Sequence, residues 1–447
     1  MKKLLFVSLG CDKNLSDSEH MLSLLAKEGF VLVDDEAEAE VIVVNTCCFI
    51  HDAMEESITT LLSLGELKKT GNLEVLLAAG CLAQRYAKDI RREIPEVDGI
   101  IGTNGYMDVV KAVREALAGK RPDYLPSLAG LPSMDSGRLL TGGGHYAYLK
   151  IAEGCDKRCT YCVIPDIRGP YRSVPIEALV QEARELAEQG VRELILVAQE
   201  TTLYGVDIYG KKDLPRLLEA LNAIEGIVWI RLLYCYPEEI DEDLIAAIKT
   251  NQKVCHYLDV PIQHCNDSIL RRMGRRTTKS DLVEKLALLR REIPDIALRT
   301  TLLLGFPGET EAMHEELMDF VRDMHFDRLG AFCYSREEGT KAAVMPDQVE
   351  ESVAMTWYDD IMRLQAVVSE ENHKTLLHKT VDVFVEGRVA DEPNVWLGRT
   401  YRDAPDIDGY LFWESEREWE SGRFVKAVIT GAHEYDLTGE LIDEPSE

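Results

Sequence analysis

Three cysteines lie close together in the chain, at Cys155, Cys159 and Cys162. Their CxxxCxxC spacing lets three thiolates converge on one iron–sulfur cluster, and Gly154 permits the turn before them. A [4Fe–4S] cluster has four irons, so three thiolates leave one iron without a protein ligand. An open metal position marks a reactive centre, and the loop therefore predicts redox chemistry on a small molecule bound to iron. A zinc site, or chance spacing of buried cysteines, is the alternative.

A second group of cysteines is dispersed in the sequence. Cys11, Cys47 and Cys81 each follow an apolar segment, and they are 36 and 34 residues apart. Successive strands of a parallel sheet end at the same edge, and ligands bind at that edge. We therefore predict that these cysteines meet and hold a second three-thiolate cluster with an open iron. The alternative is three separately buried cysteines, which are common.

The segments that precede Cys11, Cys47 and Cys81 belong to an alternation of apolar strands and helical patterns. This alternation predicts a doubly wound parallel sheet in an N-terminal domain over residues 1–120. The predicted strands are Leu4–Leu9, Val41–Val44 and Val75–Ala79, and the predicted helices are Asp17–Lys27, Ala53–Lys69 and Gln84–Ile94.

The alternation resumes after a segment rich in proline, glycine and serine, which predicts a linker over residues 121–145. Six strand–helix units over residues 146–372 predict a partial TIM-type (βα)6 barrel, whose site lies at the carboxyl ends of the strands. The predicted strands are Ala147–Ile151, Glu193–Ala198, Trp229–Leu233, Tyr257–Val260, Ala297–Leu303 and Arg328–Phe332, and Pro175–Gln189 and Lys279–Glu292 are predicted helices. The CxxxCxxC loop directly follows the first of these strands.

The last part of the chain, residues 373–447, differs from the rest. Short strands joined by turns predict a small antiparallel β-barrel. Residues 381–447 contain 17 acidic and 6 basic residues. The predicted strands are Val381–Val385, Gly409–Phe412, Phe424–Thr430 and Tyr435–Leu441.

Bulk composition restricts the class of protein. The chain has 447 residues, which is enough for two or three domains, and a formal net charge of -29. Its 11 cysteines, an odd number without a secretion signal, favour reduced thiols and metal ligands over disulfides. No apolar stretch reaches the roughly 18 residues of a membrane span. We expect a cytoplasmic protein with no membrane partner.

At this point the residues resemble a known family, the radical S-adenosylmethionine (SAM) enzymes. In that family the open iron binds the amino and carboxylate groups of SAM, which is cleaved to a 5′-deoxyadenosyl radical. The resemblance implies SAM contacts from Gln199 and Glu200 after the second barrel strand, from Arg231 in the third and from Gly305 after the fifth. For each of these residues alone, a turn glycine or a polar strand end is the alternative.

The two cysteine triads together resemble the methylthiotransferases over essentially the whole chain. In that family the N-terminal cluster carries the sulfur, the barrel cluster makes the radical that abstracts hydrogen, and a second SAM supplies the methyl group. The C-terminal barrel resembles the family's TRAM domain, which docks substrate. The resemblance implies two [4Fe–4S] clusters, ligated by Cys11, Cys47 and Cys81 and by Cys155, Cys159 and Cys162.

Known methylthiotransferases modify transfer RNA or an aspartate of small-subunit ribosomal protein S-twelve. A C-terminal barrel with a surplus of 11 acidic residues repels phosphate and suits a basic ribosomal protein. The motifs Gly10–Asn14 and Leu258–His264 resemble the RimO branch, which acts on the aspartate β-carbon. The rivals are methylthiolation of a transfer RNA adenosine and a non-catalytic iron–sulfur carrier. The enzyme would also need an electron donor such as flavodoxin or ferredoxin.

Two further residues lie within these motifs. Lys13 follows the first cysteine and is expected to be a solvated lysine, although it could bias the charge of a cluster. His264 could face the barrel interior, but a structural histidine with satisfied hydrogen bonds is the expected reading. Neither is assigned a catalytic role.

Overall fold

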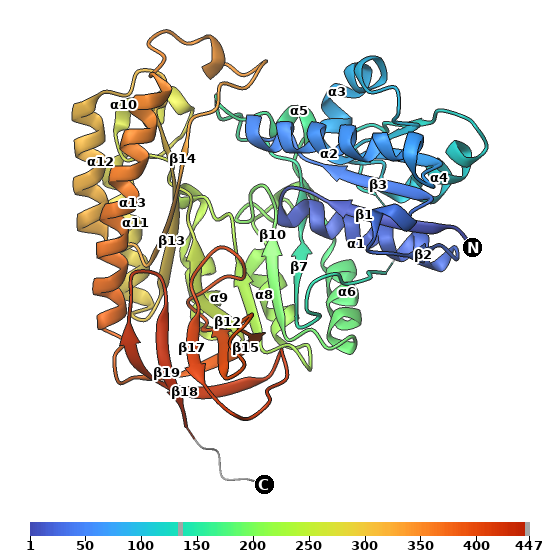
Figure 1. The fold of residues 1–447 in the computed structure, drawn as a ribbon. Helices are drawn as coiled ribbons and strands as arrows, with labels where there is room; N and C mark the ends of the chain where they lie inside the picture. The colour runs from blue at the N-terminus through green and yellow to red at the C-terminus, as the bar shows by residue number, and fades with distance from the viewer. Residues whose placement is uncertain (133–136, 443–447) are drawn as a thin grey trace.

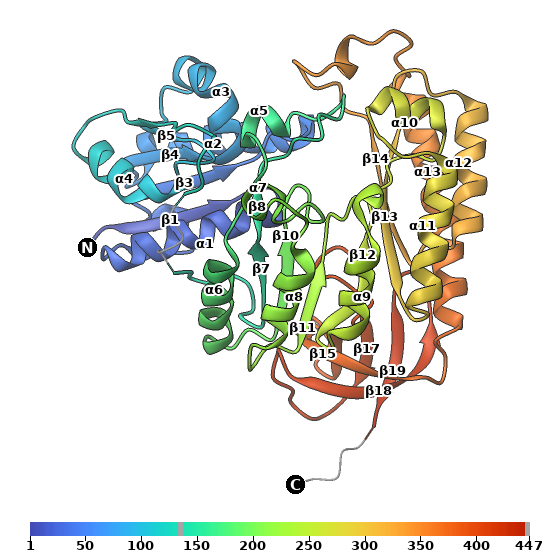
Figure 2. The ribbon, with the colours of Figure 1, turned by 180° about the vertical axis from the view of Figure 1, so that it is seen from behind.

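The computed structural model describes residues 1–132 and 137–442. The predicted linker 121–145 and the predicted C-terminal domain 373–447 therefore fall partly outside the described residues. Within them, two parallel sheets and one closed barrel follow one another along the chain. Figures 1 and 2 show the N-terminal sheet lying beside the upper part of the central barrel and the C-terminal barrel beneath it.

The N-terminal sheet is parallel, as predicted, with strand order β2-β1-β3-β4-β5-β6. Alternate residues of β3 enter two different cores: Val41 and Val43 pack with α1 and α4, whereas Ile42 and Val44 pack with α2 and α3. Helices therefore cover both faces. The strands are β1 (Lys3–Ser8), β2 (Val31–Leu32), β3 (Val41–Thr46), β4 (Val75–Ala79), β5 (Gly99–Ile101) and β6 (Asp123–Tyr124), and the helices are α1 (Asp12–Lys27), η1 (Glu36–Glu38), α2 (His51–Thr70), α3 (Gly80–Glu93), η2 (Tyr106–Asp108) and α4 (Val109–Leu117).

Several features of this domain differ from the sequence prediction, which did not include strands β2 and β5 or helix α4. Helix α1 begins at Asp12 rather than Asp17, because its polar first turns are buried against other polar groups instead of solvent. Strand β6 lies inside the segment predicted as linker, where Ile100 and Ile101 pair with Asp123 and Tyr124. Such two-residue strands carry no periodic signal.

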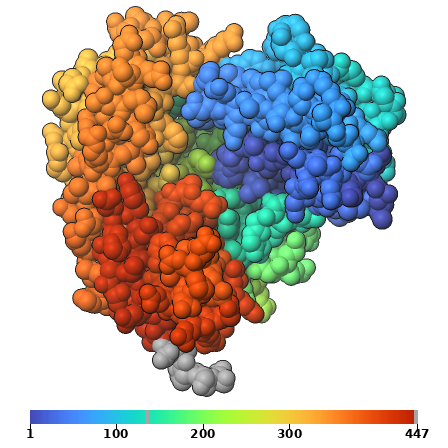
Figure 3. Space-filling model, viewed as in Figure 1, coloured from blue at the N-terminus to red at the C-terminus, as the bar shows by residue number. Residues whose placement is uncertain are grey.

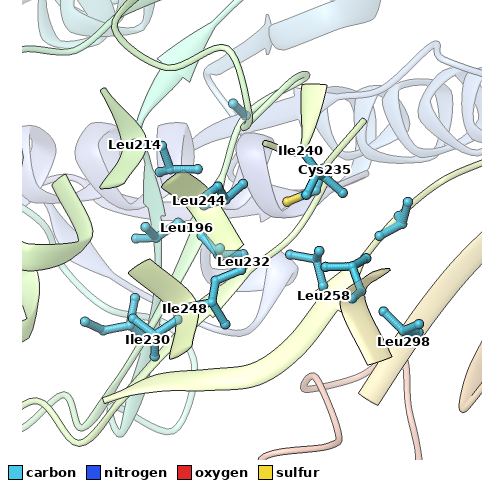
Figure 4. Close-up of a cluster of buried hydrophobic side chains, with 14 of the residues drawn as sticks. Leu196, Leu214, Ile230, Leu232, Cys235, Ile240, Leu244, Ile248, Leu258 and Leu298 are labelled. Atoms are coloured by element: carbon cyan, nitrogen blue, oxygen red, sulfur yellow. The ribbon is translucent and has the colours of Figure 1, made fainter. Parts of the chain in front are cut away.

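The central sheet is parallel, in the order β14-β13-β12-β11-β10-β7. Its two end strands are not paired to each other, so the described sheet is a partial barrel, as predicted. Figure 4 shows leucines of the strands, such as Leu196 and Leu258, packing with Leu214 and Leu244 of the surrounding helices. The strands are β7 (Tyr146–Lys150), β10 (Glu193–Val197), β11 (Trp229–Leu232), β12 (Val254–Asp259), β13 (Ala297–Leu304) and β14 (Arg328–Cys333).

Helices cover the outside of this partial barrel. Helix α11 begins with a capping box, in which Thr278 accepts from the backbone N–H of Asp281 and the Asp281 carboxylate accepts from that of Thr278. A short antiparallel pair, β8 (Ala152–Glu153) with β9 (Arg172–Ser173), flanks the cysteine loop. The helices are α5 (Ile164–Arg168), α6 (Ile176–Glu188), α7 (Val206–Tyr209), α8 (Leu214–Asn222), η3 (Pro237–Glu239), α9 (Glu242–Thr250), α10 (Asp267–Met273), α11 (Lys279–Glu292), α12 (Glu311–Met324), η4 (Ala342–Val344) and α13 (Glu351–Lys374).

The C-terminal strands close into a barrel in the order β15-β16-β17-β19-β18. Its pairings are antiparallel, as predicted, except for the short pairing of β17 with β19, which is parallel. The sequence also missed β16, whose Trp396 lies in the barrel core with Trp413. The strands are β15 (Thr380–Arg388), β16 (Val395–Arg399), β17 (Leu411–Glu414), β18 (Phe424–Ala432) and β19 (Leu437–Leu441).

A chain of buried charges fixes the C-terminal barrel to the base of the partial barrel. Glu193, at the start of β10, accepts from Arg231 at 2.7 Å and from Arg399 of β16 at 2.7 Å. Arg399 also pairs with Glu386, whose other oxygen lies 2.6 Å from Nε2 of His145. Basic and acidic side chains alternate along this chain, so each buried charge lies beside a group of opposite charge. None of the described helices is long and apolar enough to cross a membrane.

Candidate active site between two cysteine triads

The CxxxCxxC loop lies between β8 and α5. Cys155 and Cys159 are buried, and Cys162 is half-buried. The backbone N–H of Cys155 donates to the carbonyl of Gly169 at 3.1 Å. Gly154 has φ +77°, and a Cβ there would lie 2.1 Å from the Pro170 carbonyl oxygen, so only glycine fits at this turn.

The thiols of this loop influence one another. Burial, together with a smaller effect of negative charge on Cys159, raises the pKa of Cys155 to about 11 and that of Cys162 to about 12. The Cys159 sulfur lies 3.8 Å from the Tyr236 hydroxyl. Because the thiols of Cys155 and Cys162 are protonated at neutral pH, a metal centre would displace their protons on binding.

The N-terminal cysteines come together at the carboxyl edge of the first sheet. Gly10, with φ +90°, brings the chain so close to Cys47 that a Cβ would lie 2.7 Å from that residue's Cβ. Cys11 is the N-cap of α1, and Cys81 lies in the first turn of α3. Burial, together with smaller effects of the charges of Cys47 and Cys11, raises the pKa of Cys81 to about 12. Cys48 is fully buried in the apolar core.

A [4Fe–4S] cluster differs from a single ion in the geometry that it requires. Among the described residues, no three His, Cys, Asp or Glu side chains are close enough together to bind a single metal ion. In a [4Fe–4S] cluster each thiolate binds its own iron, so the sulfurs lie farther apart. Three neighbouring thiols without disulfide partners supply the donor set that such a cluster takes. Both triads therefore suit a three-thiolate cluster.

Arg168 of α5 links the N-terminal triad to the barrel. This 2% exposed side chain places Nη2 3.7 Å from the Cys81 sulfur and Nη1 2.9 Å from both Asp17 of α1 and Glu153 of β8. Lys150 pairs with the same two carboxylates. Two cations and two anions thus balance one another in a buried group between the domains. One member of this group, Glu153, lies two residues before Cys155 in the sequence. Figure 3 shows a hollow between the N-terminal domain (blue) and the later barrel segments (orange).

The structure brings Gln199 and Glu200 to the cysteine loop, where the sequence predicted SAM contacts. Gln199 donates to Glu153 at 3.2 Å, and Glu200 lies 3.8 Å from Nζ of Lys157. Burial raises the pKa of Glu200 to about 7. In the described residues, one side-chain oxygen of each residue is buried without a hydrogen-bond partner. These two oxygens suit an ammonium group of a ligand.

Arg231 does not join this group, contrary to the sequence prediction. Its guanidinium is fully buried, pairs with Glu193 and donates to the Tyr401 carbonyl at 2.7 Å. Glu193 starts β10, whereas Gln199 follows the end of that strand, so Arg231 serves the opposite end of the barrel. Gly305, with φ +71°, is required for a different reason than predicted: a Cβ there would lie 2.4 Å from Ala354 Cβ in α13.

Sequence reasoning missed several polar side chains at the mouth of the barrel. Arg275 stacks on the Tyr236 ring at 4.2 Å, and two of its guanidinium nitrogens are buried without a partner in the described chain. Lys157 pairs with Glu238 and Glu239. The position of Tyr236, just beyond the end of the third strand, was an available signal, since barrel sites lie at strand ends.

The structure contradicts the prediction made for Lys13 and confirms the one made for His264. Lys13 is 6% exposed rather than solvated: its ammonium lies 3.0 Å from Asp12 and 3.3 Å from the centre of the Tyr234 ring. The prediction of a solvated lysine was therefore wrong, because Tyr234 reaches it from the barrel. His264 is fully buried between Glu309, at 3.2 Å, and the N–H of Asn266, at 2.9 Å, which confirms a structural histidine.

Three family descriptions match the chain. The radical SAM superfamily matches residues 149–321, an uncharacterized protein family named UPF0004 matches residues 3–102, and the TRAM domain matches residues 379–442. The fold and the cysteine loop thus define a radical SAM enzyme, a class that uses a [4Fe–4S] cluster and SAM. The small C-terminal barrel is a TRAM domain.

Relatives with high identity cover nearly the whole chain. The chain is 54% identical over 437 residues to "Ribosomal protein uS12 methylthiotransferase RimO" of Lachnoclostridium phytofermentans, covering 98% of this chain and 99% of that protein. It is 46% identical over 444 residues to the protein of the same name from Clostridioides difficile, covering 99% and 100%. The chain belongs to the RimO family of radical SAM methylthiotransferases.

Solved structures with the same fold are more distant. The radical SAM methyltransferase TsrM from Kitasatospora setae has a TM-score of 0.53 and 17% identity, covering 74% of this chain and 73% of that one. The cobalamin-dependent SAM radical enzyme OxsB has a TM-score of 0.52 and 12% identity, covering 83% and 56%. These likenesses support the fold alone.

Proposed function

We propose that this protein is a methylthiotransferase that adds a methylthio group to the β-carbon of an aspartate in ribosomal protein uS12. The observation that carries the proposal is the buried contact of Arg168 with both Cys81 of the N-terminal triad and Glu153, two residues before the barrel loop, in a chain whose full-length relatives carry that name. Radical chemistry suits the reaction, because that C–H bond is too weakly acidic for ordinary general-base removal. The reaction would take place in the cytoplasm, with the ribosomal protein as partner.

Each triad has a separate role in this proposal. Three cysteines of the barrel loop would hold the cluster that binds SAM, and three of the N-terminal sheet would hold a second cluster that carries sulfur. The bound groups supply a hydrogen-abstracting radical and the sulfur that is transferred. The proposed ligands are Cys155, Cys159 and Cys162 for the first cluster and Cys11, Cys47 and Cys81 for the second.

The protein's own side chains bind and orient the cofactor. Gln199 and Glu200 would accept hydrogen bonds from the amino group of SAM through their buried oxygens. Arg275 and Lys157 offer positive charge to its carboxylate. Tyr236 packs against both cations and covers the loop, which keeps water from the reacting centre.

The acidic TRAM barrel supports a basic protein as substrate over transfer RNA. Trp413 belongs to the barrel core and Trp419 packs against it, so these two are structural. Tyr410 and Phe412 lie 6.3 Å apart, centre to centre, and are only partly buried, which leaves them able to contact an arginine or lysine. If transfer RNA docked on this domain instead, its phosphates would meet a surplus of acidic residues.

The proposal is tested with anaerobically reconstituted protein and a peptide carrying the uS12 aspartate. We expect a mass gain equal to one methylthio group and formation of 5′-deoxyadenosine. Cluster-loaded protein that modifies transfer RNA and leaves the peptide unchanged would establish the rival substrate. Failure to cleave SAM would establish an iron–sulfur carrier.

The ligand assignment has its own measurement. Replacing either triad with alanine should remove about half of the bound iron and sulfide, because each triad holds one of two clusters. The control is Cys235→Ala, a fully buried cysteine outside both triads, which should keep all the iron. Equal iron in wild type and in a triad variant would refute that triad.

A further inference from the structure

A positively charged surface covers the CxxxCxxC loop. Residues 156–162, 267–279 and 336–347 contain nine basic and five acidic residues, whereas the whole chain has 50 basic and 79 acidic residues. We call the five exposed cations of these segments the basic patch. They are Arg158, Arg271, Arg276, Arg336 and Lys341. Within residues 1–132 and 137–442, none of the five forms an ion pair with a carboxylate.

The three segments of the basic patch meet at Thr160, between the second and third cysteines of the loop. Its backbone N–H donates to the Met273 carbonyl at 2.9 Å, and its hydroxyl donates to the Arg272 carbonyl at 2.8 Å. Its own carbonyl accepts from the N–H of Ala342 at 2.9 Å. Figure 1 shows α10 and the segment after β14 together at the top of the barrel. The patch therefore lies directly over the loop.

The protein wall over the loop is thin at Gly274. This exposed glycine ends α10 with φ +78°, and a Cβ there would lie 3.8 Å from the Cα of Cys159 and 3.6 Å from the carbonyl oxygen of Arg158. The backbone of a proposed cluster ligand is thus one residue away from the outer surface. Electron tunnelling falls steeply with distance, so this is a favourable point for an electron to enter.

We propose that the basic patch is the docking site of an acidic electron-transfer protein. The inference rests on the proposed radical SAM function, which requires the cluster of the loop to be reduced. One electron passes from the reduced donor to the cluster: the donor is oxidised by one electron, the cluster is reduced by one, and no atom is transferred. Opposite charges bring the donor to a protein whose net charge would otherwise repel it.

A polyanion such as RNA would also be attracted to this surface. The position of the basic patch favours the electron donor, because it covers the loop, whereas the acidic TRAM barrel lies at the other end of the molecule (Figure 1). RNA bound at the patch would lie away from the domain proposed to dock substrate.

The test compares two triple variants of the holoenzyme. In the patch variant, Arg271, Arg276 and Lys341 are replaced by glutamate; in the control variant, the exposed Lys120, Arg291 and Arg363 are replaced, which changes net charge equally. Formation of 5′-deoxyadenosine is measured with reduced flavodoxin and, separately, with dithionite. We expect kcat/KM for flavodoxin to fall about tenfold or more in the patch variant only, with dithionite rates alike in all three proteins.

Other outcomes distinguish failure of the docking site from failure of the proposed function. Equal flavodoxin rates in the two variants would overturn the docking site. A patch variant that keeps its flavodoxin rate but loses affinity for ribosomal RNA would assign the surface to nucleic acid. If dithionite yields no 5′-deoxyadenosine with wild-type protein, the proposed function fails instead. Higher salt should reduce the difference between the variants, since screening weakens attraction between exposed charges.

Discussion

Nη2 of Arg168 lies 3.7 Å from the sulfur of Cys81, although the two residues belong to different domains. A side chain of the radical SAM barrel therefore contacts the N-terminal triad. The positive charge of Arg168 lowers the pKa of Cys81, against the larger effect of burial. A proposed cluster at this site would thus be held partly by the neighbouring domain.

Replacing Arg168 with methionine should lower the reduction potential of the N-terminal cluster. Hydrogen bonds to sulfur and nearby positive charge raise cluster potentials, and both are lost. The measurement is a redox titration followed by electron paramagnetic resonance, with the barrel triad removed so that one cluster is observed. Arg172→Met is the control, because Arg172 donates to the Arg168 carbonyl and Gly130. An unchanged potential with full iron content would refute this role.

The same variant should be less stable. Removing one partner of a buried ion group leaves charges uncompensated and typically costs about 3–5 kcal/mol. Arg168→Lys keeps the charge but cannot reach Asp17, Glu153 and Asn14 together, so an intermediate loss is expected. Chemical unfolding of the two variants measures both losses, and a lysine variant as stable as wild type would show that charge alone suffices.

Glu200→Gln should weaken SAM binding at least about tenfold, because a neutral amide replaces the carboxylate that faces the amino group. The pKa of Glu200, raised by burial to about 7, gives this effect a pH dependence. Below that pH the carboxyl is protonated and neutral, so wild-type affinity should fall, while the variant's affinity stays flat. Calorimetric titration of the holoenzyme measures this, with the exposed Glu188→Gln as control.

The pair of His145 and Glu386 should make stability depend on pH. Burial disfavours the charged imidazole, but the hydrogen bond and charge of Glu386 outweigh it and raise the pKa of His145 above 6.5. A raised pKa means that the stabilisation is present below the unfolded value and is lost as pH rises through the folded value. The Tm difference between wild type and His145→Gln should be larger at pH about 6 than at about 8.5. A constant difference would exclude the linkage.

Lys13→Met should destabilise the protein by about 3 kcal/mol, because the partly buried carboxylate of Asp12 loses its cation. The double variant Asp12→Asn with Lys13→Met removes both charges and should recover part of that loss. Urea unfolding of the two single variants and the double variant measures the coupling. If the effects simply add, Lys13 does not stabilise Asp12.

The success of sequence reasoning depended on where each residue's partners lie. The N-terminal cysteines could be grouped because parallel strands end at one edge, and Gln199 and Glu200 follow a strand end in the same way. The position of Arg231 could not be predicted, because its partner Tyr401 lies 170 residues further on, in another domain. The burial of Lys13 could not be predicted for a similar reason, since the Tyr234 ring that packs against it comes from the barrel. Partners across domain boundaries leave no periodic signal.

The charge chain at the base of the barrel sets a limit on how the enzyme can be divided. Removing residues 379–442 would leave Glu193 and Arg231 facing water without Arg399 and Tyr401. Three domains can be distinguished along the sequence, yet the partial barrel and the TRAM barrel share one buried interface. A minimal enzyme made by truncation would therefore lose part of its catalytic scaffold, and its inactivity would say nothing about substrate docking. Point substitutions on the outer surface of the TRAM barrel are the sound way to study that step.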